Sequence, residues 1–384
     1  MPENKRQHYV PQFLLRNFSV RGEGKQVGIF NLTSGTFVPD GKLARQAKKD
    51  YFYGKDGKTE KLLQNLEDES AKIIARIITE RRMPSWKKEE YSILLMFLIA
   101  SHSRTPEMAS ETQEMITKIN RQAMLNVPQF KDIADKVSLE IDNPVGFALQ
   151  TAVTMHPILT DMKCKLLLNR TKTTRLILSD HPVVLYNQLF QDQNDHRGHI
   201  GYSSKGLEIY LPVTPFAGLF FYDGAMYEVG SNRNRPVQID DKKDIEWLNG
   251  LQYLNTMENL YFDNTVSKDC VKDLMHRFAR YRREERVEIH QAPLKSREGE
   301  SFDEIIHIHK KDIKCEASFT FVRFSKAALD FMHHGGSSLA RDPITVALHR
   351  EFLRLVRAGE RDPGDFWSFV MDETEAIIKR SGPS

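Results

Sequence analysis

The spacing of apolar residues changes near residue 160, and this change constrains the fold more than any other feature of the chain. Before it, apolar side chains recur every three or four residues over long stretches, which is typical of helices that pack on a core. After it, short apolar runs of strand length follow one another, separated by polar turns. A helical first half and a sheet-rich second half predict an α+β protein.

The first half contains three long helical patterns. We expect one helix to begin near Thr59, a second to begin at Ser85 or Trp86, and a third to cover residues 107–124. Thr59 and Ser85 are residue types that cap helix N-termini, and glutamates follow Ser85 in the first turn. Residues 144–154 form a further helical piece.

The second half predicts a mostly antiparallel sheet, because short turns connect its strands. The expected strands cover residues 163–168, 175–179, 183–186, 207–213, 218–222, 226–229 and 260–262. We therefore expect a helical N-terminal layer packed on this sheet. The main domain covers residues 1–285, with its helical part at about 1–157 and its sheet-rich part at about 158–285. A charged segment then leads to a small mixed C-terminal extension, residues 286–384.

An aromatic and aliphatic stretch near the N-terminus, residues 8–18, carries His8 at one end and Arg16 near the other. Chain termini are usually polar and frayed, so this composition is unusual. Pro11 suits the first turn of a helix, and a helix N-terminus with a histidine beside it can hold an anion. Alternatively, the stretch is only a hydrophobic plug in which His8 is hydrogen-bonded to the backbone.

Other polar residues stand beside apolar patterns. Glu60 and Glu67 are seven residues apart, so they lie on one face of the first long helix, either as half-buried site carboxylates or as solvated flank residues. Arg104 follows the apolar second helix and either binds a ligand or caps the last carbonyl groups. Asp180 comes directly after an apolar strand, where catalytic groups often collect, although it can equally close a turn.

Several of these stretches together resemble a bacterial family that is catalogued only as a domain of unknown function, number 4238. The matching stretches are residues 8–11 with 15–18, residues 51–53 with Glu60 and Glu67, residues 104–106, residues 179–180 with Pro182, residues 212–215 and residues 249–261. The resemblance covers residues 5–265, and this chain has His181 where the family has a small polar residue. The family has no established activity, so the resemblance groups these polar residues without implying a reaction.

The residue types favour metal-assisted hydrolysis of phosphodiesters. Carboxylates with a histidine hold divalent cations such as magnesium or manganese, and arginine neutralises phosphate. We predict a nuclease or phosphoesterase whose catalytic residues are His8, Arg16, Glu60, Glu67, Arg104 and Asp180. The predicted metal ligands are Glu60, Glu67 and Asp180. The alternative is a non-enzymatic binding protein in which the same residues form buried ion pairs. The enzymatic hypothesis requires these side chains to meet in one pocket.

Composition and motifs limit the partners, the cellular location and the enzyme classes that we expect. A net charge of +3 is compatible with a nucleic-acid partner but too small to predict one by itself. Three widely spaced cysteines form no CxxC pair, the first residues resemble no signal peptide, and the longest apolar run, residues 93–100, is too short to span a bilayer. We therefore expect a cytoplasmic protein without a membrane partner. Walker, dinucleotide-binding and GxSxG motifs are absent from the sequence, and nothing in it indicates an oligomeric state.

Overall fold

A computed structural model describes residues 5–55, 57–191, 198–231, 235–283, 285, 287–295, 301–310, 312–336, 338–362 and 365–381. Its helices are α1 (Gln12–Asn17), α2 (Lys58–Glu80), α3 (Glu89–Ser103), α4 (Pro106–Leu125), α5 (Pro144–Thr154), α6 (Lys242–Asn255), α7 (Lys268–Phe278), α8 (Lys326–His334), α9 (Pro343–Arg357) and α10 (Phe366–Ser381). Its strands are β1 (Arg6–His8), β2 (Gln26–Asn31), β3 (Thr36–Lys42), β4 (Lys48–Asp50), β5 (Lys163–Asn169), β6 (Leu178–Ser179), β7 (Val184–Tyr186), β8 (Glu208–Thr214), β9 (Ala217–Tyr222), β10 (Tyr227–Val229), β11 (Val237–Ile239), β12 (Asn259–Phe262), β13 (Val287–Lys295), β14 (Ser301–Lys310) and β15 (Val322–Phe324).

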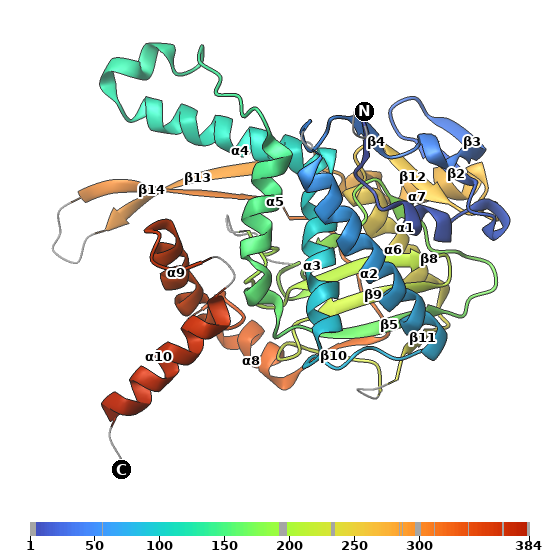
Figure 1. Cartoon of the computed structure of the whole chain (residues 1–384). Coiled ribbons are helices and arrows are strands. Elements are labelled where there is room, and N and C mark those ends of the chain that lie inside the picture. Colours follow the sequence, from blue (N-terminus) through green and yellow to red (C-terminus); the bar gives the residue numbers. More distant parts are fainter. Residues whose placement is uncertain are drawn as a thin grey trace.

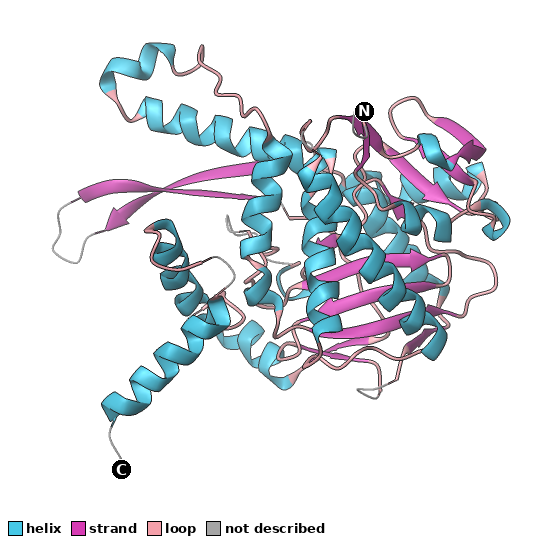
Figure 2. Ribbon diagram, in the orientation of Figure 1, coloured by secondary structure: helices cyan, strands magenta, loops and turns pink. Residues whose placement is uncertain are grey.

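A five-stranded sheet forms the middle of three layers, with the strand order β11-β5-β9-β8-β7. Helices α2 and α3 cover one face and α6 covers the other (Figures 1 and 2). Neighbouring side chains on β9 face opposite layers, since Phe221 packs in the cluster that contains Leu95 of α3, whereas Phe220 packs with Leu248 of α6. Burial of both faces explains why these strands are continuous apolar runs. The predicted α+β fold, with a helical N-terminal layer on a mostly antiparallel sheet, is confirmed.

Two strands of the second half leave this central sheet. A separate four-stranded sheet has the order β3-β2-β12-β6, so β12 lies between the N-terminal hairpin and β6. Leu260 is paired with Phe30 on one side and with Ser179 on the other. The expectation of one sheet over residues 163–262 is wrong in this respect. Strand β11, which is parallel to β5, was also not expected, because its three residues are too few to show a pattern.

The two predicted helix starts differ from those in the structure. Helix α2 begins at Lys58 after Gly57, whose φ of 68° suits glycine, so Thr59 lies inside the helix rather than at its cap. Helix α3 begins at Glu89, because residues 85–88 form a turn in which the Lys88 N–H donates to the Ser85 carbonyl oxygen at 2.9 Å. The apolar periodicity therefore located both helices but not their first residues.

An amide ladder on α6 takes the place of a neighbouring strand for residues 175–183. It consists of Asn249, Gln252 and Asn255, which are three residues apart and therefore share one face of the helix. Their side chains accept from the N–H groups of Ile177 and Ser179 and donate to the carbonyl oxygens of Arg175, His181, Pro182 and Val183. These bonds satisfy buried backbone groups that no strand pairs, so the ladder fixes where this segment runs.

The C-terminal extension is partly anchored in the main core. Ile313, Phe319 and Phe321 pack in the same cluster as α6, and β15 pairs with β10. Helices α9 and α10 then form a small cluster of their own and extend away from the sheet (Figure 1). In the part of the chain that the structure describes, no helix has the length and apolar character needed to cross a membrane.

Candidate functional site

A polar cavity of about 310 Å³ lies between β1, α1 and the first half of α2. Its lining residues are Arg6, His8, Gln12, Phe13, Arg16, Glu60, Gln64, Glu67, Asp68 and Ala71. The structure thus brings His8 and Arg16 together with Glu60 and Glu67, across more than 40 residues of sequence. Arg104 lies behind the cavity wall, and Asp180 lies elsewhere.

Successive side chains of strand β1 point to opposite sides of the strand. His8 lies toward the cavity with Arg6, whereas Gln7 between them is buried. The Gln7 side chain accepts from the Tyr53 N–H at 2.6 Å and donates to the Gly54 carbonyl oxygen at 3.0 Å. The Tyr53 hydroxyl donates to the His8 carbonyl oxygen at 2.8 Å, so this strand is held in place on the side away from the cavity.

The His8 ring is part of a short polar chain along α1. The Gln12 amide nitrogen lies 2.8 Å from His8 Nε2, and Arg16 donates to the Gln12 amide oxygen at 2.8 Å. With the amide as donor, Nε2 accepts and the ring proton resides on Nδ1. Burial, followed by the positive charges of Lys48, Arg104 and Arg16, lowers the pKa of His8 to about 4. His8 is therefore neutral at pH 7 and can accept a proton.

Helix α2 supplies the acidic wall. Burial, followed by the charge of Glu67, raises the pKa of Glu60 above its usual value, while Arg104 opposes this shift. Glu67 Oε1 accepts from Arg104 Nη1 at 2.6 Å. The Arg104 side chain is only 2% exposed, and its Nε and Nη2 atoms have no hydrogen-bond partner among the described residues. Arg104 therefore orients one oxygen of Glu67 from behind and leaves its other oxygen available.

One family model, described as "Protein of unknown function (DUF4238)", matches residues 6–266. The chain belongs to this family. No curated protein and no solved structure matches the chain. The DUF4238 region contains the whole polar cavity together with Arg104 and Asp180, and it ends before the C-terminal extension.

Asp180 has a different environment from the other predicted site residues of the DUF4238 domain. Its Oδ1 accepts from the Met257 N–H at 2.9 Å, and its Oδ2 accepts from the Glu258 and Asn259 N–H groups at 2.7 and 2.8 Å. Both oxygens are thus engaged with the connection between α6 and β12, because strand β6 pairs with β12 and delivers Asp180 there. The carboxylate joins these elements and does not face the cavity.

The three predicted metal ligands are therefore not brought together. Only Glu60 and Glu67 line the cavity, and no group of three or more His, Cys, Asp or Glu side chains within the described ranges is arranged to hold a metal ion. The expectation that Asp180 joins Glu60 and Glu67 failed because a strand end can deliver a carboxylate to backbone N–H groups as readily as to a site. Any divalent cation in the cavity would need further ligands from substrate and water.

Two buried histidines form a second polar cluster in the DUF4238 domain. The rings of His102 and His181 lie 4.9 Å apart. His102 Nδ1 is 2.9 Å from the Tyr202 hydroxyl, and His181 Nδ1 is 2.7 Å from the Thr105 hydroxyl. This cluster joins α3, the start of α4 and the segment after β6, which gives His181 a packing role.

The sequence interpretation missed four polar residues of the cavity. Arg6 is two residues from His8 on a strand, and Gln12 is four residues from Arg16 on a helix. Gln64 and Asp68 extend the polar face of α2 that also contains Glu60 and Glu67. The missed signal was this continuous polar stripe at helical spacing, since it marks one face of the helix.

The depressed pKa of His8 predicts a stability difference in acid. The unfolded chain binds the proton near pH 6.5 and the folded protein near pH 4, so the stability that His8 contributes is complete above pH 6.5 and is lost as the pH falls through 4. We expect wild type to lose on the order of 1–2 kcal/mol more than His8→Gln between pH 7 and pH 4, after allowance for solvent screening of a half-exposed ring. Urea unfolding at several pH values measures this difference. The exposed His276→Gln on α7 is the control and should follow wild type.

Proposed function

We propose that the DUF4238 domain of this protein hydrolyses phosphodiesters in the polar cavity, with a divalent cation that binds together with the substrate. The observation that carries the proposal is the convergence of His8 and Arg16 with Glu60 and Glu67 on one cavity. A volume of about 310 Å³ accommodates one phosphodiester group with part of its flanking chain. Cationic, acidic and neutral imidazole groups are the side chains that this reaction needs.

Each side of the cavity has a separate role in this proposal. Arg6 and Arg16 are exposed at the cavity and bind the non-bridging phosphate oxygens through charge-assisted hydrogen bonds. Glu60 and the second oxygen of Glu67 would hold magnesium or manganese, a cation that commonly takes one or two protein carboxylates together with substrate phosphate and water. Arg104 is a positioning residue that holds Glu67 for this purpose.

In this proposal the attacking water displaces the Gln12 amide from His8 Nε2, and that nitrogen receives the proton of the water. Arg16 is one of the charges that lower the pKa of His8, so a phosphate bound to Arg16 cancels part of that effect and raises the basicity of the ring. The water oxygen then forms a bond to phosphorus as its proton passes to His8. The ester P–O bond breaks, and solvent protonates the leaving oxygen. The products are an alcohol and a phosphomonoester.

A second candidate function is favoured by one contact. The Arg104–Glu67 ion pair is short, at 2.6 Å, and its arginine is buried, as expected for a structural pair. In that case the protein is a binding protein, with nucleic acid as one candidate partner, and the cavity residues only hold α2 against α3 and β1. This candidate accounts for Arg104 and Glu67. It does not explain the polar chain through His8 and Arg16, and it does not explain the raised pKa of Glu60.

Removal of divalent cations tests the first proposal. We expect the wild-type protein to cleave bis(p-nitrophenyl) phosphate or an oligonucleotide in magnesium or manganese. EDTA should lower the rate about 100-fold or more, because the bound cation lowers the activation free energy by several kcal/mol. Added cation should restore the rate. Release of p-nitrophenol or gel analysis measures the rate. Cleavage that EDTA leaves unchanged contradicts the cation-dependent mechanism, and absence of cleavage of both substrates in either cation favours the binding protein.

A further inference from the structure

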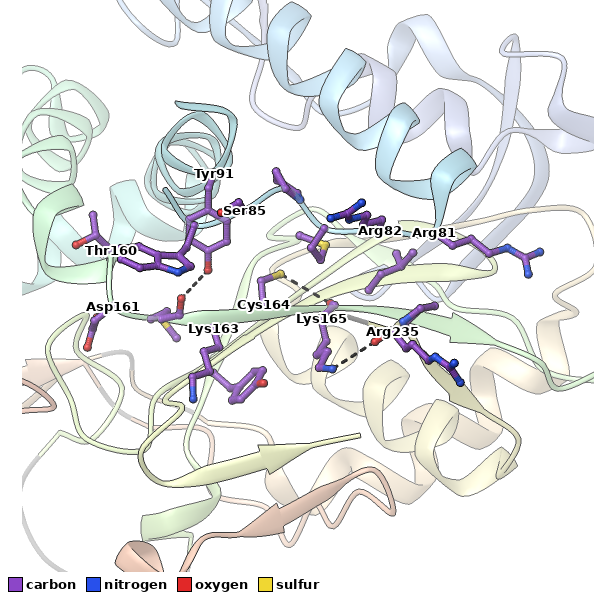
Figure 3. A pocket seen from close by; sticks show the side chains of 17 residues that line it. Arg81, Arg82, Ser85, Tyr91, Thr160, Asp161, Lys163, Cys164, Lys165 and Arg235 are labelled. Atoms are coloured by element: carbon purple, nitrogen blue, oxygen red, sulfur yellow. Dashed lines mark hydrogen bonds between the residues drawn. The ribbon is translucent and has the colours of Figure 1, made fainter. Parts of the chain in front are cut away.

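A second and larger cavity, of about 740 Å³, lies at the other end of α2 (Figure 3). The segment from Arg81 to Tyr91 forms one side, and β5 with Arg235 forms the other. Fourteen residues of sequence separate Glu67 from Arg81, which corresponds to about 21 Å along the helix. This cavity is therefore separate from the polar cavity described above.

The second cavity is strongly basic. Among the described residues, its basic lining consists of Arg81, Arg82, Lys163, Lys165 and Arg235, and Asp161 is the one acidic residue. Asp161 is already paired with Arg341, whose Nε lies 2.7 Å from it. In the described part of the chain, no ion pair involves Arg81, Arg82 or Arg235. An anionic ligand would thus meet several positive charges that protein carboxylates do not neutralise.

The sheet leaves room for this cavity where strand pairing stops. Strand β11 pairs with β5 only from Leu167 to Asn169. On that side, residues 163–166 of β5 have no neighbouring strand among the described residues. Lys163 and Lys165 stand on this open part of the strand, where their amino groups donate to the carbonyl oxygens of Gly224 and Arg235. These backbone contacts hold both lysine side chains at the cavity.

An exposed aromatic ring accompanies these charges. Trp86 is 68% exposed although it lines the cavity, and the Lys87 amino group lies 5.2 Å from the centre of its ring. The lining also includes the buried Tyr91 and Tyr222. A large exposed indole in the same cavity as three arginines offers a surface on which a planar base can stack.

We propose that this second cavity binds a nucleoside di- or triphosphate, with its base on Trp86 and its phosphates on Arg81, Arg82 and Arg235. The cavity volume lies in the range of pockets that enclose molecules of this size. One guanidinium group can donate two parallel hydrogen bonds to phosphate oxygens, so several arginines suit a ligand with several phosphates. This site is independent of the hydrolytic proposal, since none of its lining residues is shared with the polar cavity.

Isothermal titration of the full chain with ATP, inorganic tripolyphosphate and adenosine tests the proposal. We expect ATP to bind more tightly than tripolyphosphate and adenosine to bind weakly. Trp86→Ala should weaken ATP at least about tenfold and leave tripolyphosphate unchanged. Arg82→Ala and Arg235→Ala should weaken both by about 10- to 100-fold, because each removes charge-assisted hydrogen bonds. All three side chains are exposed, so circular dichroism should show a folded protein.

The matched controls are Trp367→Ala, which removes another exposed tryptophan, and Arg45→Ala, which removes an exposed arginine far along the sequence. Both should bind ATP as wild type does. Equal affinity for ATP and tripolyphosphate would overturn the nucleoside part of the proposal. ATP binding that survives Arg82→Ala and Arg235→Ala would overturn the location. Tight binding of a ten-nucleotide oligothymidylate that ATP does not displace, with no measurable ATP binding, would instead assign the cavity to single-stranded nucleic acid and overturn the proposal.

Discussion

Glu60→Gln is expected to lower kcat/KM for phosphodiester hydrolysis at least about 100-fold, because the amide can neither bind the cation as a carboxylate does nor carry its charge. The substitution keeps the size and shape of the side chain, so the cavity should retain its form. Rates on bis(p-nitrophenyl) phosphate, measured with saturating magnesium or manganese, check this expectation.

The same variant should be at least as stable as wild type at pH 8. Burial and the charge of Glu67 raise the pKa of Glu60, so the stability that this group contributes is complete below its unfolded pKa near 4.5 and is lost as the pH rises through the folded pKa. At pH 8 the ionised carboxylate is therefore a net cost, which glutamine removes. Functional carboxylates often carry such a cost in stability.

Glu69→Gln is the matched control for Glu60→Gln. Glu69 lies on the same helix, but it is exposed and forms a surface ion pair with Lys72. Its substitution should leave the rate unchanged and alter stability by less than about 0.5 kcal/mol. Full activity of Glu60→Gln together with a clearly lower melting temperature would contradict the hydrolytic proposal and support structural ion pairing.

Asp180→Ala is expected to cost roughly 3–5 kcal/mol of unfolding free energy, because it removes three hydrogen bonds from backbone N–H groups to a buried charged carboxylate. Asp180→Asn should cost about 2–3 kcal/mol, since its one carbonyl oxygen cannot replace both carboxylate oxygens and its amide points a donor at another donor. Urea unfolding at pH 7.5 measures both values. The carboxyl group is ionised at that pH, as burial raises the pKa of Asp180 only to about 6.

Asp263→Asn provides the comparison for Asp180. A single oxygen of Asp263, Oδ1, accepts from both the N–H and the hydroxyl of Thr265, so asparagine can supply the same acceptor. We expect a change below about 1 kcal/mol. Stability of Asp180→Ala close to wild type would show that the connection between α6 and β12 is held by other contacts.

Local periodicity explains how much of the polar cavity could be predicted. Residues seven apart on a helix share a face whatever surrounds it, so the sequence placed Glu60 and Glu67 together before any tertiary contact was known. The apolar residues of the opening stretch likewise predicted a short helix, with His8 just before it and Arg16 near its polar edge. Both sets of residues line the cavity. The hypothesis required α1 to lie beside α2, and this arrangement could be tested only with the structure.

Contacts between elements explain what could not be predicted. Arg104 and Glu67 are 37 residues apart, and no periodicity relates them. The end of β6 looked like a site, but the amide ladder of α6 and the N–H groups before β12 surround Asp180. The second cavity depends on where β11 stops pairing with β5, which is a property of sheet register.

The sequence by itself determined the α+β class, the positions of the long helices and most strands, and the shared face of Glu60 and Glu67, because these follow from interactions between residues near one another in the chain. Only the tertiary structure decided that His8 and Arg16 meet that face, that Asp180 does not, and that a separate basic cavity forms at the far end of the same helix. These facts depend on how surfaces that are distant in sequence pack together. Hydrophobic burial drives that packing, but it is non-directional, so it does not specify which apolar surfaces come into contact.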